Sequence, residues 1–118
     1  MMKLPLIQHL IDGQQVAGSS RIAEVFNPAT GQAEKCVLLA DKLTVEDAIA
    51  SAQAAYPAWR ATPPLKRARV MSNLKVLLEQ HAEDICALVT AEHGKVLADS
   101  MGELQRGMAF DPVREYRD

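Results

Sequence analysis

Cysteine and histidine side chains are the first candidates for chemistry in this chain. A cysteine nucleophile needs a neighbouring base or an electropositive niche to form its thiolate. Cys36 stands in an apolar stretch, and Cys86 stands beside a helical apolar stripe, so we interpret both as buried small hydrophobic residues. His9, His81 and His93 are scattered, and neither cysteine has a partner at metal-ligand spacing. We therefore predict no catalytic cysteine and no metal site.

Two pairs of glycines have the spacing of a phosphate-binding loop. Residues 13–18 and 102–107 both read G-x4-G, but neither segment is followed by the lysine that such a loop requires, and no G-x-G-x-x-G occurs. We interpret these glycines as turn or packing positions. The sequence alone thus predicts no nucleotide-binding loop.

Composition limits the classes of protein to consider. The chain has 118 residues, 48% hydrophobic and 4% aromatic, with 13 Lys+Arg and 15 Asp+Glu, so its formal net charge is −2. This length suits one domain or part of one. Four basic residues cluster without interleaved aromatic residues, which favours a solvated face over a nucleic-acid site: Lys66, Arg67, Arg69 and Lys75.

No targeting signal or membrane-spanning run is evident. The longest purely apolar run, residues 36–40, is far shorter than the roughly 20 residues that cross a bilayer. Two cysteines without a paired-spacing motif are typical of a reduced compartment. We expect a cytoplasmic protein with neither a membrane nor a nucleic-acid partner.

The elements that must position any site fall into two groups. Residues 7–11 and 14–16 flank Asp12 and Gly13, which favour a type I′ hairpin, and residues 22–26 and 33–39 flank a turn with Pro28 and Gly31. From residue 44 the apolar period becomes helical. A capping-box spacing at Thr44 begins the first predicted helix, which runs from about 44 to 58.

Three more helices are predicted after the first. The second begins at the proline pair 63–64 and ends near 81, and the third has acidic residues at 83–84 and is stopped by Gly94. The fourth spans about 96–109, is weakened by Gly102 and Gly107 and is ended by Pro112. We expect β-hairpins over 7–40, helices over 44–109, and a frayed tail over 110–118.

Four short segments resemble the N-terminal part of the aldehyde dehydrogenase superfamily in order and spacing. They are residues 10–13 (LIDG), 26–31 (FNPATG), 56–64 (YPAWRATPP) and 92–95 (EHGK). Residues 64–71 (PLKRARVM), 92–97 (EHGKVL) and 102–107 (GELQRG) are most similar to the CoA-acylating branch of methylmalonate-semialdehyde dehydrogenases. The resemblance covers about residues 7–108.

This resemblance implies a fold and an activity. The expected fold is the N-terminal part of an α/β aldehyde dehydrogenase-like domain, without the Rossmann-like sheet. Family enzymes use NAD and a cysteine nucleophile to oxidise an aldehyde, and this branch passes the acyl group of malonate or methylmalonate semialdehyde to CoA. Neither Cys36 nor Cys86 matches the catalytic position. We therefore expect this chain to be inactive alone and to bind neither NAD nor CoA tightly.

One site residue carries over from the resemblance. Arg106 corresponds to an arginine that helps to hold the substrate carboxylate, and its fixed guanidinium fork suits bidentate binding with Gly107 leaving room beside it. After residue 108 the chain departs from the family pattern, so we expect a truncation or a shifted reading frame. The alternative hypothesis is a non-catalytic module whose exposed apolar faces bind a second copy or a full-length relative.

Overall fold

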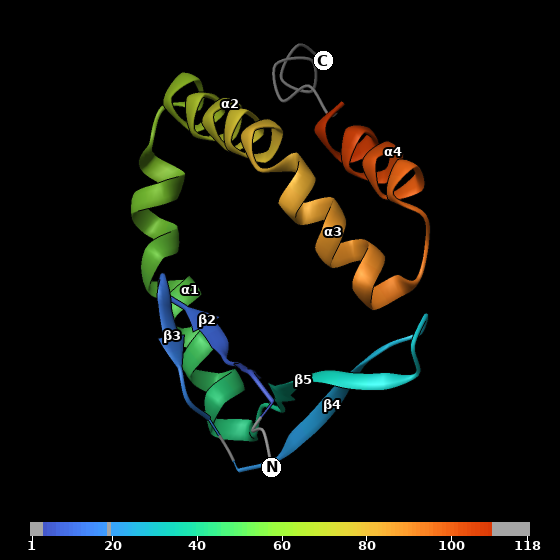
Figure 1. Ribbon diagram of the computed structural model, residues 1–118. Coiled ribbons are helices and arrows are strands. Elements are labelled where there is room, and N and C mark those ends of the chain that lie inside the picture. Colours follow the sequence, from blue (N-terminus) through green and yellow to red (C-terminus); the bar gives the residue numbers. More distant parts are fainter. Residues whose placement is uncertain (1–3, 19, 110–118) are drawn as a thin grey trace. The chain divides into compact units, whose positions relative to one another are not determined.

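The computed structural model describes residues 4–18 and 20–109 of the chain. The chain forms two compact units, Met1–Ala61 and Thr62–Asp118 (Figure 1). The predicted tail at 110–118, including the helix end at Pro112, lies outside the described residues.

A three-stranded sheet forms part of the first unit. Its order is β1 (Leu6–Ile7), β5 (Gln32–Leu38) and β4 (Ile22–Asn27). β4 and β5 are antiparallel, as predicted for the second hairpin, whereas β1 runs parallel to β5 and pairs Leu6 with Cys36. The sheet thus joins a local hairpin to a strand that lies about thirty residues away in the sequence.

A separate hairpin follows β1. It joins β2 (His9–Ile11) to β3 (Gln14–Val16) in antiparallel register. Asp12 and Gly13 have φ values of 52° and 69°, which is the positive-φ pair that a type I′ turn requires. The turn prediction is confirmed. The prediction of one strand over 7–11 is wrong, because Ile7 belongs to β1 and pairs with β5 instead.

The turn between β4 and β5 is held by Asn27. Its Oδ1 accepts a hydrogen bond from the backbone amide of Ala29 at 2.9 Å, and its carbonyl accepts one from the amide of Gly31 at 2.8 Å. Gly31 has a φ of 69°, so the predicted use of this glycine for the chain reversal is confirmed.

Helix α1 (Lys42–Ala61) completes the first unit. Oδ1 of Asp41 accepts hydrogen bonds from the backbone amide of Thr44 at 2.9 Å and from its hydroxyl at 2.7 Å. The cap is therefore Asp41, and the prediction that Thr44 begins the helix is wrong because the carboxylate upstream is the acceptor. The helix also continues past Pro57 and ends at Ala61, three residues beyond its predicted end at about 58.

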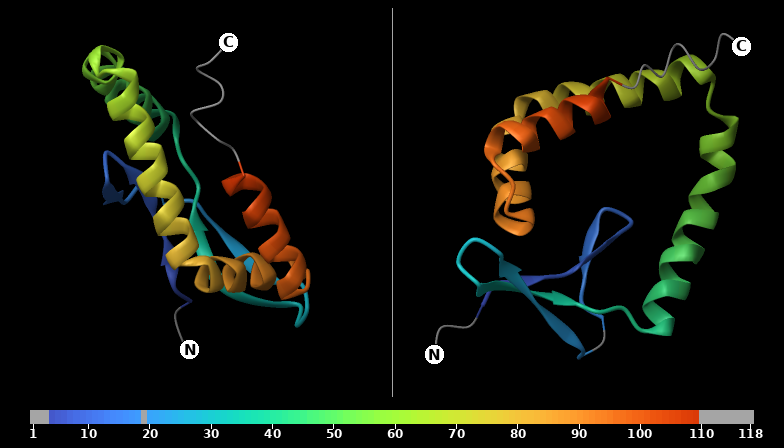
Figure 2. Two further views of the ribbon diagram at one scale, coloured as in Figure 1. Left: turned by 90° about the horizontal axis from the view of Figure 1, so that it is seen from above. Right: turned by 90° about the vertical axis from the view of Figure 1, so that its right-hand side faces the viewer.

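Three helices form the second unit. They are α2 (Pro64–Gln80), α3 (Ala82–His93) and α4 (Leu97–Met108), and α4 turns back along α3 (Figure 2). A proline occupies the first turn of α2, and Gly94 ends α3 in the left-handed region with φ 82°. These three helix predictions are confirmed to within about two residues.

The most completely buried side chains lie between α3 and α4. Cys86 is fully buried, Ser100 is 1% exposed, and the hydroxyls of Ser100 and Thr90 share a hydrogen bond of 2.9 Å. The prediction of a buried Cys86 is confirmed. Cys36 is only half-buried, so the prediction of a buried side chain there is wrong. Its strand β5 is paired on both edges, but most of its side chains are half-buried or exposed.

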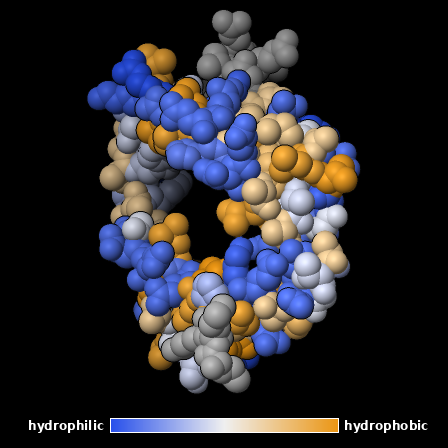
Figure 3. Space-filling model, viewed as in Figure 1, coloured by the Kyte–Doolittle hydropathy of each residue, from blue (hydrophilic) through white to orange (hydrophobic). Residues whose placement is uncertain are grey.

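Many large apolar side chains of both units are exposed (Figure 3). The helical stripes predicted from the sequence contribute Ile49, Tyr56, Trp59, Val70, Met71, Leu74 and Leu77 to this surface. Such an extent of exposed apolar surface is typical of a chain that packs against another polypeptide. Among the described helices, none is both long and apolar enough to span a membrane.

Candidate carboxylate-binding site

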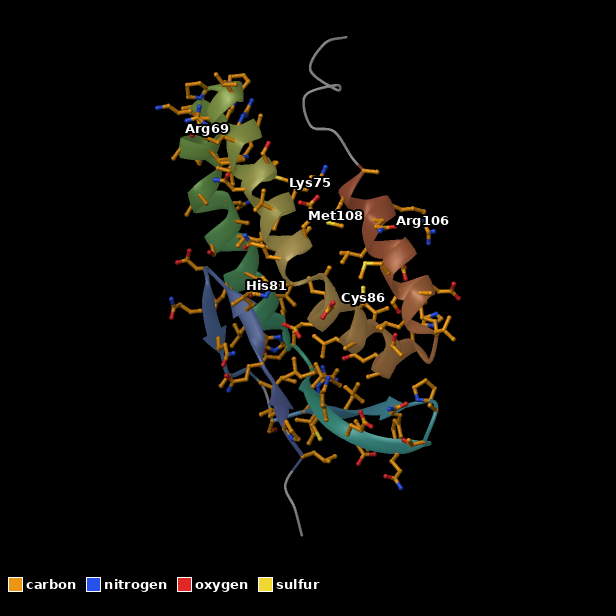
Figure 4. The ribbon with its side chains drawn as sticks, turned by 45° about the horizontal axis from the view of Figure 1, so that its top comes forward. Arg69, Lys75, His81, Cys86, Arg106 and Met108 are labelled. Atoms are coloured by element: carbon orange, nitrogen blue, oxygen red, sulfur yellow. The ribbon has the colours of Figure 1, made fainter. Side chains whose placement is uncertain are left out.

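Arg106 lies in the last turn of α4, on the face directed away from α3 (Figure 4). The helical period explains this placement. Ser100 and Leu104 line the side of α4 that meets α3, so a residue two positions after Leu104 falls on the opposite side. The Arg106 side chain is consequently exposed, whereas Cys86 on α3 is enclosed by the helix pair.

Two glycines of α4 lie near Arg106, one helical turn before it at Gly102 and directly after it at Gly107. A Cβ atom added to Gly102 would lie 3.7 Å from a terminal guanidinium nitrogen of Arg106, whereas one added to Gly107 would meet nothing within 4 Å. The guanidinium thus extends back along the helix over Gly102. The space beside Gly107 is open, and Gly102 is the glycine that the guanidinium approaches.

An ion pair lies next to this arginine. Lys95, in the turn between α3 and α4, contacts the carboxylate of Glu103 through its Nζ atom. The Lys95 side chain is 18% exposed and the Glu103 side chain is 56% exposed. The hydrogen bond from Lys95 lowers the pKa of Glu103, and the charges of Lys95, Arg106 and His93 lower it further.

Arg106 makes no hydrogen bond or salt bridge to another residue within the described ranges. Within these ranges, none of its N–H donors is used by another side chain. A planar guanidinium binds a carboxylate through two parallel N–H···O bonds, which fixes both the position and the orientation of the bound group. The arrangement can hold an anionic end of a small molecule, but it supplies no nucleophile.

The four glycines with phosphate-loop spacing do not form a dinucleotide-binding loop. Gly13 forms a hairpin turn, and Gly18 packs against the side chains of His9 and Thr44. Gly102 and Gly107 lie inside α4 rather than at a helix N-terminus, where backbone amides would face a phosphate. These glycines therefore build no phosphate cradle for NAD.

Two residues of this region were missed by the sequence reasoning. Lys95 and Glu103 are eight positions apart across a turn, so no helical spacing links them. The signal was Gly94, because a helix that ends there reverses the chain and brings the next residues alongside the following helix. Arg106 itself was placed by resemblance, and its carboxylate-binding role stays a prediction.

Comparison with known proteins identifies the family of this chain. The model of the aldehyde dehydrogenase family matches residues 15–116, and the chain belongs to this family. Among the relatives, the malonate-semialdehyde dehydrogenase of Pseudomonas aeruginosa is 53% identical over 102 residues, which cover 86% of this chain and 20% of the relative. The malonate-semialdehyde dehydrogenase 2 of Geobacillus thermodenitrificans is 38% identical over 109 residues, which cover 92% of this chain and 23% of the relative.

Solved structures agree with the fold. The methylmalonate-semialdehyde dehydrogenase of Oceanimonas doudoroffii is 58% identical with a TM-score of 0.87, over 89% of this chain and 22% of that chain. A structure from Sinorhizobium meliloti, assigned to the same enzyme and complexed with NAD, is 38% identical with a TM-score of 0.87. The match covers 92% of this chain and 22% of that chain. The chain thus has the N-terminal part of an aldehyde dehydrogenase fold and spans about a fifth of the length of these relatives.

Proposed function

We propose that this chain is the part of a malonate- or methylmalonate-semialdehyde dehydrogenase that holds the carboxylate of the substrate. The reaction of the whole enzyme would be the NAD- and CoA-dependent oxidation of the semialdehyde to an acyl-CoA. Support comes from identities of 53% and 58% to proteins that carry these names. The role proposed for this chain is binding and orientation, because its described residues offer no cradle for NAD.

The observation that carries the proposal is the state of Arg106. Its guanidinium is exposed, lies beside Gly102, and has no hydrogen-bonding partner among the described residues. A semialdehyde of malonate has one carboxylate and one aldehyde group. A fork that fixes the carboxylate leaves the aldehyde directed toward groups supplied by another segment.

A chimeric enzyme tests this role. Residues 1–108 would replace the matching segment of the Pseudomonas aeruginosa enzyme, and NADH production would be followed with malonate semialdehyde and with propanal, which has no carboxylate. We expect Arg106→Gln to raise KM for malonate semialdehyde by about tenfold or more, because a charge-assisted contact is lost, and to leave KM for propanal unchanged. Arg69→Gln on α2 is the matched control. Equal effects of Arg106→Gln on both substrates would contradict the proposal.

We also propose that the chain is inactive alone. The purified 118-residue chain would be incubated with malonate semialdehyde, NAD and CoA, and the expected result is no NADH above the enzyme-free rate. Sustained NADH production that depends on CoA would overturn this expectation.

A second candidate function is a non-catalytic interaction module. It is favoured by the exposed stripe on α2, which includes Val70, Leu74 and Leu77. This surface would drive association with a second copy, so sedimentation velocity should show assembly that increases with concentration. Leu74→Glu should reduce the assembly, and a folded monomer at high concentration would exclude this function.

We further propose a cytoplasmic location. The supporting observation is that Cys36 and Cys86 are both free thiols, as expected in a reducing compartment. Fluorescence of a tagged chain in cells would test this location.

A further inference from the structure

We propose that Lys95 holds the Glu103 carboxylate away from Arg106 and thereby keeps the Arg106 guanidinium open to an external carboxylate. Lys95 and Glu103 are positioning residues in this scheme, since neither is required to touch the ligand. The proposal rests on the carboxylate-binding role proposed for Arg106, and it adds Lys95 and Glu103 as the residues that keep the Arg106 guanidinium accessible.

Glu103 is the natural competitor for Arg106. It precedes Arg106 by three positions on α4, and an acidic residue followed three or four positions later by a basic one forms a favourable pair on a helix surface. A carboxylate in the Arg106 fork would block the same N–H donors that an external carboxylate needs. In the structure this local pair is not formed, because Glu103 binds Lys95 instead.

Two features favour the observed arrangement. The Lys95 side chain is largely covered, at 18% exposure, so its attraction to Glu103 is less screened than that of a fully solvated pair. Gly102 has no side chain, and a Cβ atom added there would lie 3.7 Å from the Arg106 guanidinium. The guanidinium therefore lies over this glycine. The carboxylate thus contacts Lys95 in the turn before α4, whereas the guanidinium lies beside Gly102 within α4.

The lowered pKa of Glu103 agrees with this arrangement. The hydrogen bond from Lys95 is the largest cause, and the charge of Arg106 is a smaller one. His93 also contributes a favourable charge. Glu103 is therefore ionised at neutral pH, and it would act as a competing anion if Lys95 were removed.

The binding test uses the whole chain and malonate as the probe. NMR would follow the Nε–H signal of Arg106 during a malonate titration. We expect Lys95→Met to weaken malonate binding by about two- to fivefold, the range of a surface ion pair, and the double change Lys95→Met with Glu103→Gln to restore it. Lys75→Met on α2 is the matched control and should have no effect. Weakening that the second substitution does not restore would overturn the proposal.

A second measurement keeps the two proposals distinguishable. The proposed function of Arg106 fails if the unsubstituted chain does not bind malonate. It also fails if Arg106→Gln leaves the binding unchanged. The Glu103 proposal is then decided by carboxyl ¹³C titration. Arg106→Gln should raise the pKa of Glu103 more in a Lys95→Met background than in the unsubstituted chain, because only there does the carboxylate pair with the guanidinium. Equal changes in the two backgrounds would overturn it, and Lys95→Gln serves if Lys95→Met does not fold.

Discussion

Ser100 on α4 and Thr90 on α3 share a hydrogen bond of 2.9 Å between their hydroxyls. Ser100 is 1% exposed, and the fully buried Cys86 belongs to the same side of α3, one turn before Thr90. This bond is a polar connection between the two helices. Because water has little access to it, each hydroxyl depends on the other for its partner.

Replacing Ser100 with alanine should destabilise the second unit. The change leaves the Thr90 hydroxyl without its partner in a part-buried position, so we expect a loss of about 1–2 kcal/mol in the free energy of unfolding. Urea unfolding followed by circular dichroism measures it. Ser72→Ala is the control, because the Ser72 hydroxyl is exposed and bonds only to its own helix, and its effect should stay within about 0.5 kcal/mol.

A double-mutant cycle tests the assignment to this hydrogen bond. Thr90→Val together with Ser100→Ala should cost less than the sum of the single changes by about 1 kcal/mol. Additive effects would show that the two hydroxyls do not stabilise one another.

The cap of α1 should make stability depend on pH. The hydrogen bond from the Thr44 backbone amide, followed by that from its hydroxyl, lowers the pKa of Asp41 below its ordinary value of 3.8. A lowered folded-state pKa gives stability that is fully present above the unfolded value and is lost as the pH falls through the folded value. Thermal unfolding from about pH 6 down to pH 2 should therefore lose this contribution below about pH 4.

Asp41→Asn isolates this effect from that of other carboxylates. Asparagine also caps helices but does not titrate, so the variant should lose less stability on acidification than the unsubstituted chain. Asp41→Ala should lower the helix content at neutral pH as well. The same acid dependence in the Asn variant and the unsubstituted chain would contradict the assignment.

Two glycines of the second unit should respond to alanine with opposite signs. Gly94 has φ 82°, so Gly94→Ala should destabilise by about 1–2 kcal/mol. Gly107 lies within α4 with nothing within 4 Å of an added Cβ, so Gly107→Ala should stabilise by about 0.5–1 kcal/mol. Chemical unfolding of both variants tests the pair, and a change of the same sign in both would be inconsistent with the structure.

The close neighbours of Gly18 leave no room for a larger residue at this position. An added Cβ would lie 3.0 Å from Nε2 of His9 and 3.1 Å from the hydroxyl of Thr44, so Gly18→Ala should cost about 1–3 kcal/mol through overpacking. Removing the imidazole with His9→Ala should recover part of this loss, as measured by thermal unfolding. An equal loss in the presence and absence of the imidazole would indicate a different cause.

Local signals in the sequence predicted the parts of the fold that depend on neighbouring residues. Asp12 and Gly13 define a turn by their own conformational preferences, and Gly94 ends a helix for the same reason. The cap was misplaced at Thr44 because two acceptable cap residues stand three positions apart, and only the structure shows that Asp41 is the acceptor.

Contacts between distant residues could not be predicted in this way. The parallel pairing of Leu6 with Cys36 and the contact of Lys95 with Glu103 leave no periodic pattern in the chain. The position of Arg106 on the outer face of α4 follows from helical spacing. Whether Glu103 occupies the Arg106 guanidinium depends on the ion pair between Glu103 and Lys95, which helical spacing does not predict. Prediction was therefore best for backbone conformation and poorest for side-chain partners.

The two-residue strand β1 has a consequence for handling the protein. It covers one edge of β5, whose other edge is already occupied by β4. Loss of residues 4–7 through proteolysis or tag removal would uncover backbone amides and carbonyls along a strand that includes Cys36, Val37 and Leu38. Such an edge can recruit a strand from another molecule, so we expect loss of these few residues to increase the tendency of the chain to aggregate.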